Sequence, residues 1–276
     1  MASKATFSFQ TCQTVLCDLL HDMHSLHRKG VIDGKTLVKV AGAHAAAAMI
    51  QPFRQTSDID VIMSDAPLIQ ELLVEHYPAR YFLQCDKSER NLYRNLGTHG
   101  ARASLQFPID LIRVSSMAQG HPVTSSMISI KKMMSKLPDA FDKRGFANLL
   151  DLIVLKIGAI VSEDRDPKKI PQDEQDLKQL VNCQNDAMKS RKRPLNAGDL
   201  SGEDLHARYL FCYYDHPKVG RIGDTLRSWL FMSPGSRPSL LDLKGNIILQ
   251  YADHERERDK WESEDCDDDY DDDMEF

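Results

Sequence analysis

The sequence of 276 residues lacks an apolar run approaching the ~20 residues needed to cross a bilayer. Its first segment, MASKATFSFQ, also lacks the continuous apolar stretch of a secretory signal. Six cysteines are scattered without a C-x-x-C pair, which argues against a zinc knuckle or a disulfide framework. These absences predict a protein of a reducing compartment, cytoplasmic or nuclear, that has no membrane partner.

Aromatic residues are also scarce, and at 7% of the chain they form no cluster on which the bases of an RNA could stack. This scarcity argues against an adaptor whose main task is to bind RNA. Hydrophobic residues make up 42% of the chain, which is ordinary for a globular protein. The length allows one sizeable core or two small ones.

Charge is unevenly distributed along the chain. Residues 253–276 contain fourteen acidic and three basic residues, a net charge of −11, so a total of −6 leaves +5 for the remainder. Such a block of like charge predicts a disordered acidic tail. The mildly basic remainder is compatible with binding nucleotide or RNA. The basic run KSRKRP, residues 189–194, is either a solvated loop or a patch for nuclear import or phosphate binding.

The stretch GAHAAAAMIQPFRQTSDID, residues 42–60, carries two aspartates separated by one isoleucine. Before it, the apolar residues Leu37, Val38, Val40 and Ala41 predict a short half-buried strand that enters a turn at Gly42. The alanines that follow favour a helix, which Pro52 would end. The segment DIDVIM then predicts a second strand, on which Asp58 and Asp60 share a face because successive side chains alternate.

A third aspartate interrupts the apolar segment ASLQFPIDLIRV. This segment predicts a strand with Asp110 on one face and four apolar side chains on the other: Leu105, Phe107, Ile109 and Leu111. Adjacent carboxylates repel one another, so such a group persists where a cation neutralises it, although a pair at a strand end can also be simply solvated. Three aspartates beside a helix N-terminus predict a site for a divalent metal and a triphosphate.

In this order, the glycine turn, the helix, the D-x-D strand and the later Asp strand resemble the signature of the DNA-polymerase-beta-like nucleotidyltransferase superfamily. The segments RQTSDIDV and KIGAIVSEDRDPKKIPQDEQDLKQL are most similar to minimal nucleotidyltransferases and to the toxin subunits of bacterial abortive-infection systems. The resemblance covers about residues 35–182. It implies that Asp58 and Asp60 bind two Mg (or Mn) ions, and that Asp110 is the third ligand and activates the acceptor hydroxyl.

The resemblance also implies an NTP as the donor substrate, with the acceptor hydroxyl on RNA, on a protein or on a small molecule. It assigns five residues to nucleotide binding: Gly42, Ala43, His44, Arg54 and Lys156. Arg165 or Lys169 is a further candidate. The family usually has a second Gly or a Ser where this chain has Ala43. In this chain the segment between the glycine turn and Asp58 is also slightly longer than in the common family pattern. The hydroxyl is therefore missing at Ala43, although its backbone N–H can still donate. His44 either replaces the missing donor or caps the helix.

Two hypotheses follow from this departure: an active nucleotidyltransferase, or a catalytically weakened member that acts as a nucleotide-binding or scaffold module. The expected fold class is α/β (α+β), with a small mixed-sheet head followed by a helical domain. We expect an N-terminal amphipathic helix in residues 1–34, the head in 35–120, the helical domain in 121–232, an extension in 233–252 and the tail in 253–276. In the first helix, Cys17, His21 and His24 either form a metal-binding cluster or simply lie on the solvent-exposed face.

Overall fold

A computed structural model describes residues 6–86, 89–97, 105–114, 117, 121–134, 145–163, 165–190, 204–213, 216–219, 239–241, 247–250, 256 and 258–259. The chain divides into two compact units. The first comprises Met1–Val114 and Ser126–Leu152, and the second comprises Ser115–Ser125 and Ile153–Phe276. The chain thus returns to the first unit at Ser126, whereas the sequence-based boundary between head and helical domain lies at residues 120 and 121.

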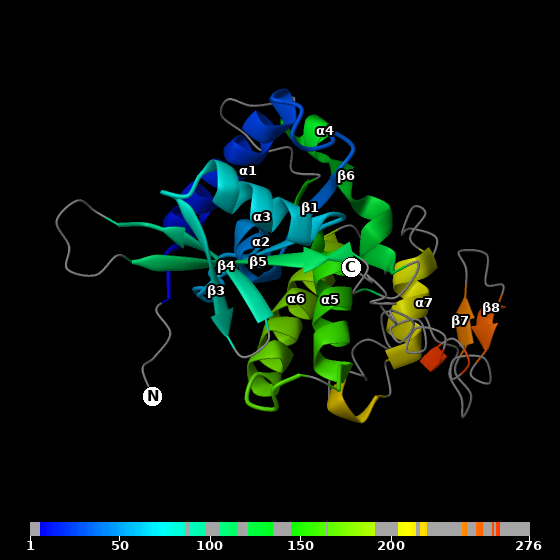
Figure 1. Ribbon diagram of the computed structural model, residues 1–276. Coiled ribbons are helices and arrows are strands. Elements are labelled where there is room, and N and C mark those ends of the chain that lie inside the picture. Colours follow the sequence, from blue (N-terminus) through cyan, green and yellow to red (C-terminus); the bar gives the residue numbers. More distant parts are fainter. Residues whose placement is uncertain are drawn as a thin grey trace. The chain divides into compact units, whose positions relative to one another are not determined.

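The first unit contains a six-stranded mixed sheet (Figure 1). Its strands are β1 (Leu37–Ala41), β2 (Ile59–Met63), β3 (Tyr81–Asp86), β4 (Glu89–Asn95), β5 (Gln106–Arg113) and β6 (Ile128–Ser129). They lie in the order β3-β4-β5-β2-β1-β6, in which β2 and β5 run parallel and the neighbouring pairs are antiparallel. The expected α/β class with a mixed sheet is confirmed.

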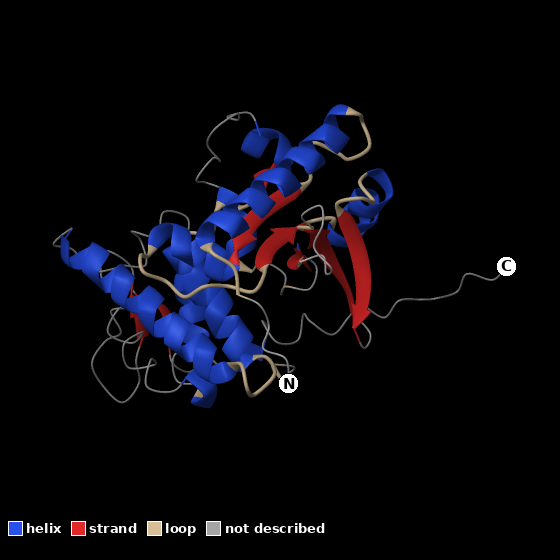
Figure 2. Cartoon of the chain, turned by 90° about the vertical axis from the view of Figure 1, so that its left-hand side faces the viewer, coloured by secondary structure: helices blue, strands red, loops and turns tan. Residues whose placement is uncertain are grey.

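In its described part this unit contains the helices α1 (Phe9–Arg28), α2 (Gly42–Met49), α3 (Ala66–His76) and α4 (Ile130–Met134). Both views show helices packed beside the strands of the sheet (Figures 1 and 2). Helix α1 confirms the predicted amphipathic helix, because every apolar side chain of its core-facing stripe is buried: Val15, Leu16, Leu19, Leu20, Met23 and Leu26. Ser8 caps this helix by accepting a hydrogen bond from the Thr11 N–H at 3.1 Å.

A buried polar contact fastens α1 to β3. The Asp22 carboxylate accepts hydrogen bonds from the Tyr81 hydroxyl at 2.9 Å and from Arg80 Nη1 at 2.7 Å. Burial, reinforced by the Asp22 charge, raises the pKa of Tyr81, so its hydroxyl stays protonated and remains a donor. The helix is therefore fixed to the sheet by satisfied polar groups as well as by its apolar stripe.

The described residues of the second unit form three helices and a pair of strands. Helix α5 (Leu149–Val161) begins in the first unit and continues into the second, followed by α6 (Ile170–Ser190) and α7 (Asp204–Tyr213). The sequence also predicts helices over residues 146–163, 171–181 and 201–214, and each is present, although α6 continues to Ser190. From its sequence, the segment LLDLKGNIILQ, residues 240–250, fits either a helix or a hairpin. Together with Ser239 it holds the antiparallel strands β7 (Ser239–Leu241) and β8 (Ile247–Gln250). The run KSRKRP, apart from the backbone of its first two residues, and most of the acidic tail lie outside the described residues.

Strand β4 is absent from the sequence-based expectation. Its sequence ERNLYRN is rich in polar and charged residues and gives little apolar signal, yet it is paired on both sides by β3 and β5. The sequence predicts that Asp58 lies within β2 and that Leu105 belongs to the apolar face of β5, and both details are wrong. Strand β2 begins at Ile59, one residue after Asp58, and Leu105 lies just before β5 with 51% of its surface exposed. None of the described helices is both long enough and apolar enough to span a membrane.

Candidate functional site

Three residues form a row across adjacent strands of the first unit. Ala41 at the end of β1 is the register partner of Asp60 in β2, and Asp60 is the register partner of Asp110 in β5. Residues that lie opposite each other in register place their side chains on the same face, on strands about 5 Å apart. Asp60 is half-buried and Asp110 is exposed. The structure therefore brings together two of the three aspartates that the sequence singles out.

The row ends at a glycine turn that lies in close contact with the Asp60 side chain. Gly42 begins α2 with a positive φ of 66°. A β-carbon at this position would overlap the Asp60 carboxylate. Glycine alone combines this backbone conformation with this closeness at no steric cost. The turn thus places the N-terminus of α2 directly beside the Asp60 carboxylate.

The N-terminus of α2 carries no side-chain cap. The residue at its N-cap position is Ala41, which has no side-chain acceptor for the first N–H groups of the helix. These N–H groups and the helix dipole favour an anion at this end. Gly42 and Ala43 lie in this first turn of α2.

The third aspartate is held differently. Asp58 precedes β2, is half-buried, and accepts a hydrogen bond on Oδ1 from the Thr56 hydroxyl at 2.9 Å. Thr56 is itself fixed, because its carbonyl oxygen accepts the Phe7 N–H at 2.8 Å. Sequence reasoning did not single out Thr56. The signal that points to it is a hydroxyl residue two positions before a carboxylate, a spacing typical of local side-chain turns.

The donor set fits Mg or Mn in part. Within the described ranges, no group of three or more His, Cys, Asp or Glu side chains is arranged to hold a metal ion. Asp58 therefore does not complete a three-ligand group with Asp60 and Asp110. Magnesium is usually held by one or two carboxylates together with the phosphate oxygens of a substrate. The oxygen-only pair of Asp60 and Asp110 fits that pattern.

His44, in the first turn of α2, packs into the interior and is 1% exposed. Its Nε2 lies 3.1 Å from Gln13 Oε1, and its ring stacks on Phe9 with ring centres 4.8 Å apart. Burial lowers the pKa of His44 to about 4, so the ring is neutral near pH 7. Its Nδ1 is buried and has no hydrogen-bond partner among the described residues. The ring is thus directed to α1 rather than to the helix N-terminus, where it was expected either to replace the missing donor or to cap the helix.

Arg54 lies on the loop between α2 and β2. Together with Ala43, His44 and Thr56 it lines a small pocket of about 150 Å³, which is also bordered by the first turn of α1. Its Nη1 donates to the Gln55 carbonyl at 3.3 Å. Arg54 therefore lies near the first turn of α2.

Lys156 belongs to the second unit, on α5. Its Nζ lies 2.7 Å from Asp173 Oδ1 and 2.9 Å from Asp176 Oδ2, both on α6. Arg165 Nε donates to the second Asp173 oxygen at 2.7 Å, while Lys169 is exposed. Lys156 and Arg165 are thus engaged in an ion-pair network that joins α5 to α6.

No family model and no curated protein matches this chain. Among solved structures, it is similar to the crystal structure of an antigenic nucleotidyltransferase-like protein from Paracoccidioides brasiliensis. The two are 13% identical, the match covers 81% of this chain and 95% of that one, and the TM-score is 0.47. A likeness of this degree carries no conclusion about function.

Proposed function

We propose that this protein is a metal-dependent nucleotidyltransferase that moves a nucleoside monophosphate from an NTP to a hydroxyl acceptor. One observation carries the proposal: Asp60 and Asp110 share a register position and a face, and Asp60 touches the glycine turn that begins α2. A pair of carboxylates and an uncapped helix N-terminus meet at one end of the sheet. This combination suits a substrate that brings both phosphate groups and a divalent cation.

The phosphates would lie at the N-terminus of α2. The Gly42 and Ala43 N–H groups donate there, and the helix dipole adds partial positive charge. Because these donors belong to the backbone, they survive the absence of a hydroxyl at Ala43. Arg54, which lines the pocket beside this turn, supplies a cation for the same phosphates.

Asp60 and Asp110 would hold Mg or Mn. The sequence resemblance implies Asp58 as a further ligand, although in this structure Asp58 is not grouped with the other two carboxylates. When bound, the metal neutralises charge on the phosphates and on the departing pyrophosphate. Asp110 is exposed, so one of its carboxylate oxygens can accept the proton of the acceptor hydroxyl. The hydroxyl oxygen then bonds to the α-phosphorus, and the bond from that phosphorus to pyrophosphate breaks.

The acceptor is a hydroxyl on RNA, on a protein or on a small molecule. The net charge of +5 outside residues 253–276 is compatible with an RNA acceptor. For Lys156 we keep the sequence-based assignment to triphosphate binding as part of the proposal. Its ion pairs with Asp173 and Asp176 give it a structural task in addition.

A second candidate is a catalytically weakened nucleotidyltransferase-fold protein that serves as a nucleotide-binding or scaffold module. Two observations favour it: Ala43 lacks the family hydroxyl, and the described residues form no three-ligand metal group. The two candidates differ in turnover and share nucleotide binding. Purified protein, incubated with labelled NTPs, Mg or Mn, and cell extract, therefore separates them by whether label is transferred to an acceptor.

Calorimetry tests the site itself. We expect Mn to bind the wild type and to bind Asp60→Asn at least tenfold more weakly, because one carboxylate of the pair is lost. The matched control is Glu71→Gln, which removes the same charge from a side chain that is 65% exposed on α3. An unchanged Mn affinity in Asp60→Asn would show that this carboxylate holds no metal and would remove the basis of the enzyme proposal.

A nonhydrolysable ATP analogue with Mg tests the turn. Ala43→Ser should keep or raise affinity for the analogue, since it restores the hydroxyl that the family usually has. Gly42→Val should abolish binding, because a branched side chain would fill the space beside Asp60. If neither wild type nor Ala43→Ser binds the analogue while both remain folded, nucleotide binding at this turn is refuted.

A further inference from the structure

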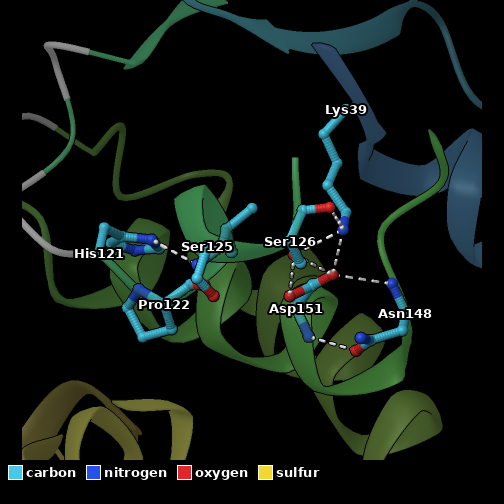
Figure 3. Close-up of polar contacts among 8 residues, drawn as sticks. Lys39, His121, Pro122, Ser125, Ser126, Asn148 and Asp151 are labelled. Atoms are coloured by element: carbon cyan, nitrogen blue, oxygen red, sulfur yellow. Dashed lines mark hydrogen bonds and ion pairs between the residues drawn. The ribbon is translucent and has the colours of Figure 1, made fainter. Parts of the chain in front are cut away.

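A buried ion pair joins the strand that leads into the glycine turn to the start of α5. Lys39, in the middle of β1, places its Nζ 3.0 Å from Asp151 Oδ2, and the two side chains are 3% and 0% exposed (Figure 3). Both residues belong to the first unit. Neither was singled out by sequence reasoning, in which a lysine inside an apolar strand and an aspartate inside an apolar helix carried no assignment.

The pair sits in a connected network of hydrogen bonds. Lys39 Nζ donates to the Ser126 carbonyl at 2.8 Å and to the Ser126 hydroxyl at 2.6 Å, so with Asp151 its three N–H donors have three acceptors. Asp151 accepts the Asn148 N–H at 3.1 Å and lies 3.2 Å from the Ser126 hydroxyl. In turn, the Asn148 side chain accepts the Asp151 N–H at 2.9 Å and caps the first turn of α5.

Stability alone is a weak reason for such a pair. Removing two charges from water costs several kcal/mol per ion, and replacing a buried pair by apolar side chains of similar size is often neutral or stabilising. When all hydrogen-bonding groups of a buried ion pair have partners, the pair instead fixes one arrangement of the segments that it joins. Here the segments are β1, the residue Ser126 and the N-terminus of α5.

The position of Lys39 relates it to the candidate site. On β1, Lys39 lies two residues before Ala41, so both side chains point to the same face, the one that carries Asp60. Between them, Val40 accepts the Ala147 N–H at 2.8 Å and forms a bridge with Phe146. The last residues of β1 before the Gly42 turn are thus held from outside the sheet by the same segment that supplies Asp151.

From this arrangement we propose that Lys39 and Asp151 are positioning residues: their ion pair holds the end of β1, and with it the Gly42 turn, in place against Asp60. The link to catalysis rests on the proposed function of this site. The link to the turn does not, because it concerns the order of the backbone. The two parts can therefore be measured separately.

The experiment uses the full-length double variant Lys39→Met/Asp151→Leu, which replaces the pair by apolar side chains. We expect its melting temperature to lie within a few degrees of the wild type, whereas either single variant melts several degrees lower because it leaves a buried unpaired charge. Hydrogen exchange of residues 38–49 should be at least tenfold faster in the double variant, with the exchange of residues 15–26 in α1 unchanged. Affinity for the nonhydrolysable ATP analogue should fall at least fivefold.

The control is Tyr81→Phe, which removes a buried polar contact from the α1–β3 side of the same unit. It should lower the melting temperature and leave the exchange of residues 38–49 unchanged. If the double variant does not fold, Asp151→Asn, measured well below its melting temperature, should show the same faster exchange. If a folded variant, either the double variant or Asp151→Asn, exchanges the amide hydrogens of residues 38–49 at the wild-type rate, the positioning role is overturned. A wild type that binds no analogue overturns the proposed function, and the exchange result still decides on the pair.

Discussion

The Asp60 carboxylate lies against the α-carbon of Gly42, in the space that a side chain at position 42 would fill. Gly42 also has a φ of 66°, in the left-handed region that favours glycine. Two independent constraints, one from the backbone and one from a neighbouring strand, therefore select the same residue type. Mutations that remove one constraint at a time measure how strongly the turn and the Asp60 carboxylate depend on each other.

We predict that Gly42→Ala lowers the free energy of unfolding by about 2 kcal/mol or more, because the strained φ and the overlap with Asp60 both contribute. Asp60→Ala alone should have a small effect. Combining them should recover at least about 1 kcal/mol, since the overlap disappears and the strained φ remains. Urea denaturation of the four proteins measures this double-mutant cycle.

Additive effects in that cycle would mean that Asp60 moves away at little cost, and that φ alone selects glycine. A loss in the double variant larger than the sum would show that the Asp60 carboxylate supports the turn. Either result would contradict the steric account of Gly42.

The glycine turn and the strands that carry the aspartates were largely predictable because their signals are local. Short apolar runs mark β1 and β2, and in β5 the alternation of apolar residues places Asp110 opposite the buried residues of its strand. Which strands pair, and in which register, depends on contacts distant in sequence. The row of Ala41, Asp60 and Asp110 therefore needed the structure.

The parts that sequence reasoning missed share that cause. Strand β4 is stabilised by β3 and β5 rather than by its own apolar residues. Lys39 and Asp151 are 112 positions apart, and each alone is typical of a solvated side chain. The burial of His44 likewise depends on α1, which no pattern within the alanine-rich helix records.

Asp110 should be replaceable without loss of fold. Its side chain is exposed, so Asp110→Asn should change the melting temperature by no more than a few degrees. If its carboxylate accepts the proton of the acceptor hydroxyl, turnover should fall at least a hundredfold while affinity for the nucleotide analogue changes little. A thermal melt, a label-transfer assay and calorimetry supply the three measurements. A large drop in melting temperature would instead mark Asp110 as structural.

Lys156 should be important for the stability of the second unit. Lys156→Met leaves the buried carboxylates of Asp173 and Asp176 without the ammonium that lies between them. We expect the free energy of unfolding to fall by about 3 kcal/mol, measured by urea denaturation. Lys178→Met, which removes an exposed lysine from α6, is the matched control and should change it by less than about 0.5 kcal/mol. Equal stability of the two variants would show that the network contributes nothing measurable.

His44 should make the protein less stable in mild acid. Its pKa is about 4 in the folded protein against an ordinary value of 6.5, so the unfolded chain binds the proton more readily than the folded one. The neutral ring therefore contributes its full stability above pH 6.5, and that contribution is lost as the pH falls towards 4. Between pH 7 and pH 5 this loss amounts to about 2 kcal/mol.

The variant His44→Gln removes this titration and isolates it from that of the many carboxylates of the chain. From pH 7 to pH 5, the free energy of unfolding of the wild type should fall by about 2 kcal/mol more than that of the variant. Urea denaturation at both pH values gives the difference directly. Parallel losses in the two proteins would mean that His44 accepts a proton without leaving its place between Phe9 and Gln13, and its burial would then not set the acid sensitivity of the fold.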